Sequence, residues 1–164
     1  MSHLPVFEAL LPAVADACRA TYGDRLVSLV VFGSVARGTP KADSDVDLLV
    51  VADDLPRGRI RRMREFDAVK QRLAAALARA AVQGVATRLS PIFKTPMEVR
   101  AGSPLFFDMT EDARLLHDRD DFMVTALRDL RDRLARLGAR RIWKGDSWYW
   151  DLKPDYRPGE VFEI

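Results

Sequence analysis

Hydrophobic residues recur along the chain with two different periods, which predict a mixture of helices and strands. Residues 6–22 carry apolar side chains at helical spacing, and Pro12 either kinks this helix or marks its start. Two short apolar runs rich in β-branched residues, 26–32 and 46–51, predict buried strands. Residues 58–82 return to helical spacing. The stripe expected to be buried on this long helix consists of Ile60, Met63, Phe66, Val69, Leu73, Leu77 and Ala80.

The second half of the chain continues the alternation with shorter elements. Residues 85–93 predict a third strand, and Pro91 within it indicates an edge position or a bulge. Short helices, a strand and a longer helix are expected next, at 96–100, 104–112, 113–117 and 121–137. This order predicts an α/β (α+β) fold, with a small mixed sheet and helices packed on it.

The last residues differ in composition from the rest. We expect residues 1–138 to form one domain and residues 139–164 to form an aromatic tail that belongs to the same module. The tail holds all three tryptophans, and its Pro and Gly residues indicate an extended path rather than a helix. Its aromatic side chains either pack back on the domain or form a docking surface, and the sequence leaves both open.

Composition then removes several classes of function. With 164 residues the chain is long enough for one domain with a sizeable core. It has no apolar run near the roughly 20 residues of a membrane span, and no signal-peptide pattern, so we expect a cytoplasmic protein. A lone Cys18 excludes a disulfide framework and a thiolate zinc site. The net charge of +2 gives no strong reason to expect a nucleic-acid partner.

One segment, residues 33–51 (GSVARGTPKADSDVDLLVV), combines two chemical features. The first strand ends at Gly33-Ser34, where glycine permits close approach of a ligand and free N–H groups and a hydroxyl suit a phosphate. Asp45 and Asp47 come eleven and thirteen residues after Ser34, and because they stand at i and i+2 they face the same way. Paired carboxylates repel each other unless a cation joins them, and Mg²⁺ accepts both carboxylate and phosphate oxygens. The segment therefore predicts nucleoside triphosphate chemistry.

Two residues between these features are further candidates for contact with the nucleotide. Arg37 follows the phosphate-binding turn directly, and Ser44 immediately precedes the paired acids. We expect both to line the nucleotide site.

Segment 33–51 resembles the signature of the DNA polymerase beta-like nucleotidyltransferase superfamily, and the short chain resembles its minimal members in bacteria and archaea. The resemblance implies that Gly33 and Ser34 hold the triphosphate of ATP. It also implies that Asp45 and Asp47 are the catalytic carboxylates and ligate Mg²⁺, normally as part of a two-metal site. The implied reaction transfers a nucleoside monophosphate to a hydroxyl and releases pyrophosphate.

The resemblance is incomplete at one point, because the family usually supplies a third carboxylate from a later strand. The candidate strand, 85–93, has Arg88 and Ser90 where an acid would be sought. The nearest later acids are Glu98, Asp108, Glu111 and Asp112. Each either folds back toward the site or is a solvated charge at a helix end.

The resemblance also implies a partner and a role. Minimal nucleotidyltransferases are often antitoxins that adenylylate a tyrosine of a HEPN-type toxin, an RNase-like helical protein. Two alternatives remain open: a protein that neutralises or scaffolds its partner by binding alone, and an RNA-directed enzyme or binder that uses the arginines of residues 57–64. The sequence leaves formation of a homo-oligomer open.

Overall fold

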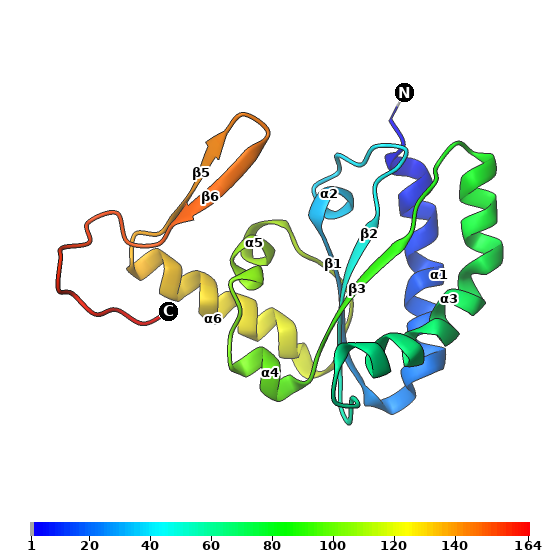
Figure 1. Cartoon of the computed structure of the whole chain (residues 1–164), viewed down its shortest axis with the longest axis horizontal. Helices are drawn as coiled ribbons and strands as arrows, with labels where there is room; N and C mark the ends of the chain where they lie inside the picture. Colours follow the sequence, from blue (N-terminus) through cyan, green and yellow to red (C-terminus); the bar gives the residue numbers. More distant parts are fainter. Residues whose placement is uncertain (1) are drawn as a thin grey trace.

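The computed structural model describes residues 2–164 and places a four-stranded sheet between two layers of helices (Figure 1). The predicted mixed α/β architecture is confirmed. The helices are α1 (Leu4–Tyr22), α2 (Gly33–Ala36), α3 (Arg59–Val82), α4 (Pro96–Arg100), α5 (Leu105–Asp112) and α6 (Phe122–Arg136), with 3₁₀ turns η1 (Gly23–Arg25) and η2 (Arg119–Asp121). The strands are β1 (Leu26–Phe32), β2 (Val46–Ala52), β3 (Leu89–Lys94), β4 (Arg114–Asp118), β5 (Arg140–Lys144) and β6 (Ser147–Asp151).

The main sheet has the strand order β3-β2-β1-β4. Strand β1 runs antiparallel to both β2 and β4, whereas β2 and β3 are parallel. Strand β3 lies at the edge of the sheet, as Pro91 predicts. The register places Asp47 between Phe32 of β1 and Ser90 of β3. The sheet therefore brings residues 32, 47 and 90 into one row.

Each face of the sheet has its own core. Helices α1 and α3 cover one face, and α4, α5 and α6 lie on the other (Figure 1). Because side chains alternate along a strand, Leu29 and Val31 of β1 join the first core while Val30 joins the second. Helix α1 begins at Leu4 and continues through Pro12, so this proline does not mark its start. Among the described residues, no helix is both long and apolar enough to cross a bilayer.

The predicted range of helix α3 is confirmed to within one residue, but one of the residues predicted to lie on its buried face is exposed. Phe66, Val69, Leu73 and Ala80 are buried, whereas the Ile60 side chain is 72% exposed. Successive residues of an α-helix are about 100° apart, so two steps of three residues turn Ile60 by about 120° from Phe66. Repeated steps of three residues, without a step of four, therefore place a side chain away from the buried face of the helix.

Residues 139–164 contain no helix, as predicted, and part of this tail forms a second, two-stranded sheet that was not predicted. Strands β5 and β6 pair as an antiparallel hairpin joined by Gly145 and Asp146. Gly145 has φ 61°, a conformation that glycine adopts without steric cost. A Gly-Asp pair between two runs of alternating apolar and polar residues is typical of a β-hairpin, so this hairpin could have been predicted from the sequence.

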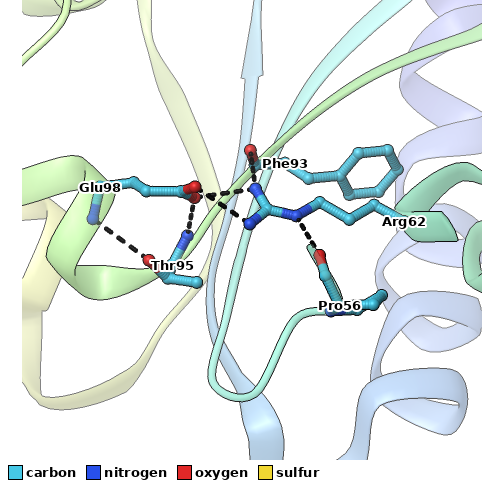
Figure 2. Close-up of polar contacts among 5 residues, drawn as sticks. All are labelled: Pro56, Arg62, Phe93, Thr95 and Glu98. Atoms are coloured by element: carbon cyan, nitrogen blue, oxygen red, sulfur yellow. Dashed lines mark hydrogen bonds and ion pairs between the residues drawn. The ribbon is translucent and has the colours of Figure 1, made fainter. Parts of the chain in front are cut away.

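A cluster around Arg62 and Glu98 fixes the start of α3 against α4 (Figure 2). The Arg62 guanidinium donates to both carboxylate oxygens of Glu98, at 2.8 and 3.0 Å, and to the backbone carbonyl oxygens of Pro56 and Phe93. Glu98 also accepts from the backbone N–H of Thr95 at 2.7 Å, in a capping box at the start of α4. These hydrogen bonds hold the pKa of the Glu98 carboxyl below its usual value, with that from Arg62 as the largest cause.

This cluster predicts an acid-dependent stability difference. Because the pKa of Glu98 is lower in the folded chain, the ionised side chain stabilises the fold above its ordinary pKa of 4.5 and loses this effect as the pH falls through the lowered value. Glu98→Gln should therefore reduce the free energy of unfolding by about 1 kcal/mol at pH 7, a value discounted for partial exposure. Urea unfolding followed by circular dichroism should show that this difference in stability between the two chains shrinks as the pH falls below 4.5. A stability difference between the two chains that does not depend on pH would show that the charge of Glu98 does not stabilise the fold.

Candidate nucleotide site

The candidate site lies where β1 turns into the short helix α2. Gly33 begins α2 with φ 72°, in the left-handed region. A Cβ atom at this position would lie 2.3 Å from Oδ2 of Asp47. Glycine is thus required twice, for its backbone conformation and for the close approach of a carboxylate. The predicted phosphate turn and the predicted acidic strand are in direct contact.

The two predicted acids come together at the start of β2. Asp45 directly precedes the strand and is exposed, whereas Asp47 lies within it and is half-buried. Burial raises the pKa of the Asp47 carboxyl, and the Asp45 charge adds to this effect; the Ser90 hydroxyl and the Arg37 charge act in the opposite direction. The two carboxylates therefore repel each other, and a divalent cation that also binds phosphate oxygens would relieve this repulsion.

The loop between α2 and β2 is ordered by its own hydrogen bonds. The backbone N–H of Thr39 donates to the carbonyl oxygen of Ser34 at 2.9 Å. The hydroxyl oxygen of Ser44 accepts from the backbone N–H of Lys41, also at 2.9 Å. Ser44 thus closes a turn directly before the acids, and its role toward a nucleotide stays a prediction.

Ser90, and not an acid, stands beside Asp47 on the neighbouring strand. Each of the four later acids has its own surroundings, and two of them, Asp108 and Asp112, line a cavity together with Gly33. Glu98 is held by Arg62, Asp108 accepts from the indole N–H groups of Trp148 and Trp150, Asp112 pairs with Arg141, and Glu111 is exposed. Within residues 2–164, no three His, Cys, Asp or Glu side chains gather closely enough to share one ion. Asp47 is the carboxylate that lies against Gly33, with Asp45 two residues before it.

Arg37 extends from the end of α2 toward the C-terminal hairpin. Its guanidinium carbon lies 4.7 Å from the ring centre of Trp148, and its Nη1 lies 3.8 Å from Oδ2 of Asp112. Gly33, Arg37, Asp112 and Trp148 all line one cavity of about 240 Å³. Asp112, one of the four later acids, therefore lies toward this site, whereas the position of Trp148 beside Arg37 was not predicted. The alternation of Trp148 and Trp150 around Tyr149 was the available evidence for one inward-facing side of the tail.

The arginine-rich segment at the start of α3 divides into two parts. Arg62 is committed to the cluster with Glu98, and its side chain is only 13% exposed. Arg57, Arg59, Arg61 and Arg64 are exposed. Four of the five arginines are therefore accessible to solvent.

Residues 11–99 match the family model of the nucleotidyltransferase domain. This match covers more than half of the chain and includes the whole of segment 33–51, so the chain belongs to the nucleotidyltransferase domain family. The fold and the contact between Gly33 and Asp47 agree with the resemblance that the sequence carries.

A curated relative extends the similarity beyond the matched domain. The chain is 29% identical over 141 residues to the Methanocaldococcus jannaschii protein named "Putative protein adenylyltransferase MJ1305". The aligned region covers 85% of this chain and 90% of that protein.

Solved structures with similar chains are more distant. One, a toxin-antitoxin crystal structure with AMP-PNP, is 20% identical with a TM-score of 0.46, and the alignment covers 78% of this chain and 92% of that one. Another, the toxin-antitoxin MntA-HepT, is 18% identical with a TM-score of 0.44, covering 80% of this chain and 92% of that one. The family assignment rests on the sequence match.

Proposed function

We propose that this nucleotidyltransferase uses Mg-ATP to transfer AMP to a tyrosine hydroxyl on a HEPN-type toxin, and so acts as an antitoxin. The observation that carries the proposal is the contact between Gly33 and Asp47, which sets a phosphate-binding turn against a carboxylate pair. The adenylyl group is favoured by the M. jannaschii relative, whose name includes protein adenylyltransferase. The HEPN-type partner is proposed on the resemblance of segment 33–51 to antitoxin nucleotidyltransferases.

The residues at the site fit a Mg-nucleotide. Asp45 and Asp47 would hold the ion, and its positive charge would offset the repulsion between the two carboxylates. Bound Mg²⁺ supplies charge stabilisation at the oxygens of the transferring phosphate. Gly33 and Ser34 would hold the triphosphate through backbone N–H groups and the hydroxyl, and Arg37 would add a cation beside them.

The proposed step forms one bond and breaks another at the α-phosphorus. The acceptor oxygen bonds to this phosphorus while the bond to the bridging oxygen of the β-phosphate breaks, so that pyrophosphate leaves. The hydroxyl proton passes to water. Ser90 cannot act as the base that a third carboxylate would provide, but a phenol has a pKa near 10, far below that of an aliphatic alcohol. A tyrosine acceptor therefore suits a site with two carboxylates.

Transfer of label from two forms of ATP tests this proposal. The chain is incubated with Mg²⁺ and the protein encoded by the adjacent gene, using ATP labelled in the α-phosphate or in the γ-phosphate. We expect label on the partner from the α-position and none from the γ-position, and a Tyr→Phe change at the modified residue should abolish it. Label from the γ-position, or none from either, would contradict adenylyl transfer.

Ser90 beside Asp47 favours a second candidate, in which the chain neutralises its partner by contact alone. Asp45→Ala discriminates the two, because a binding protein would still neutralise the partner fully whereas the enzyme would not. The exposed arginines at 57, 59, 61 and 64 keep RNA as a further alternative. A filter-binding titration with RNA against salt would show steeply salt-dependent binding if they are an RNA surface.

A further inference from the structure

We propose that the C-terminal hairpin β5–β6 positions Arg37 at the nucleotide site, with Trp148 and Asp112 as the positioning residues. This inference rests on the proposed nucleotide site and adds to it a support that comes from more than a hundred residues further along the chain. Arg37 is a nucleotide-binding candidate, whereas the two positioning residues touch its guanidinium and act through it.

The first support is the stacking of Arg37 on the hairpin. The guanidinium carbon of Arg37 lies 4.7 Å from the centre of the Trp148 ring, within the range of a cation–π contact. The Arg37 side chain is 24% exposed, so the contact is partly shielded from water. A flexible arginine directly after a phosphate-binding turn is thereby restricted to a few rotamers before any nucleotide arrives.

The second support is that the Trp148 ring is itself fixed. Its indole N–H donates to Oδ1 of Asp108 at 2.7 Å, and the Trp150 indole N–H donates to the same oxygen at 2.8 Å. Trp150 also packs edge-on against Phe107 of α5, with ring centres 6.2 Å apart. The hairpin is thus held on α5 by two hydrogen bonds and an aromatic contact, all on its inward side.

The third support is a carboxylate shared by two arginines. Oδ2 of Asp112 accepts from Arg141 of β5 at 2.5 Å and lies 3.8 Å from Nη1 of Arg37. The Asp112 and Arg141 side chains are 14% and 16% exposed, so this charge is largely removed from water. Because Arg141 makes the shorter contact, Asp112 attracts Arg37 without pairing with it fully. The Arg37 guanidinium keeps donors free for a phosphate.

The geometry places this network beside the site and not elsewhere on the surface. Gly33, Arg37, Asp112 and Trp148 line the same cavity of about 240 Å³. A larger cavity, of about 710 Å³, is lined by residues of α4, α5 and α6 and by none of the predicted site residues. Loosening the hairpin should therefore act on nucleotide binding through Arg37.

Equilibrium dialysis with labelled ATP and Mg²⁺ tests the inference on the full chain. Trp148→Ala should weaken ATP binding about tenfold, which corresponds to a desolvated cation–π contact. Trp148→Phe, which keeps an aromatic face, should recover most of the affinity. Tyr149→Ala is the matched control, because Tyr149 lies on the same strand with a side chain 48% exposed, and it should leave binding unchanged.

A double-mutant cycle separates positioning from a general structural effect. In an Arg37→Ala background, Trp148→Ala should cause no further loss of ATP affinity, because its effect passes through Arg37. Asp112→Asn provides a second test that does not depend on the hairpin staying folded without Trp148. It should also weaken ATP binding, and this effect should disappear when Arg37 is already replaced by alanine. Additive losses, or unchanged binding in both single variants, would overturn the inference. Absence of ATP binding in the unaltered chain would instead contradict the proposed function.

Discussion

Replacing Gly33 by alanine should reduce nucleotidyl transfer about a hundredfold while lowering stability only modestly. The new Cβ would lie 2.3 Å from Oδ2 of Asp47, and Cγ of Asp47 would be 3.3 Å away. Asp47 must therefore rotate its carboxylate out of the site, and a displacement of about 1 Å at a reacting centre can cost about a hundredfold in rate. The positive φ of 72° adds about 1 kcal/mol of strain.

Gly84→Ala is the matched control for this prediction. Gly84 also has a positive φ, 83°, but a Cβ there would meet no atom within 4 Å. Both variants should lose similar stability in urea unfolding, whereas only Gly33→Ala should lose label transfer from ATP. Equal activity in the two variants would show that the approach of Asp47 to Gly33 has no part in the reaction.

The second large effect is expected for Asp47→Asn, which should reduce transfer by at least about a hundredfold. The amide keeps the shape of the side chain but removes the charge that would ligate Mg²⁺. Stability should move the other way. Because burial raises the pKa of Asp47 above its ordinary 3.8, its ionised form destabilises the fold above that pH. The variant should therefore be at least as stable as the unaltered chain at pH 7.

Urea unfolding at pH 7 and at about pH 4 checks this prediction independently of catalysis. The advantage of the asparagine variant should shrink as the pH falls, since protonation removes the same charge from the unaltered chain. A variant that loses both activity and stability would instead identify Asp47 as a structural residue. Loss of transfer activity with retained or higher stability is expected when a functional residue lowers the stability of the fold.

The sequence predicts most of the main sheet and the approach of the two motifs. Strand 26–32 matches β1, and strand 46–51 matches β2 except for its last residue, because β-branched apolar runs leave little choice of structure. The i, i+2 spacing of Asp45 and Asp47 places them together as expected. Contact with Gly33 depends on the antiparallel pairing of β1 with β2, which sequence patterns alone do not specify.

The support of the site by the C-terminal hairpin lies beyond sequence reasoning. Trp148 and Arg37 are more than a hundred residues apart, and only the packing of the hairpin on α5 brings them together. Likewise, the sequence leaves open whether Asp108 and Asp112 fold back toward the site or stay solvated, and their partners come from the tail. In the structure, Trp148 of the tail reaches the cavity that Gly33 and Arg37 line at the candidate nucleotide site.

The proposed role of the pair Asp45 and Asp47 is to serve transfer of AMP to a tyrosine of a partner protein. Intact-mass and peptide mass spectrometry can detect this product on the protein encoded by the adjacent gene, after incubation with Mg-ATP and this chain. We predict an added AMP on a tyrosine with the unaltered chain and none with Asp47→Asn. An unmodified partner with both chains, or the same adduct with both, would contradict this role.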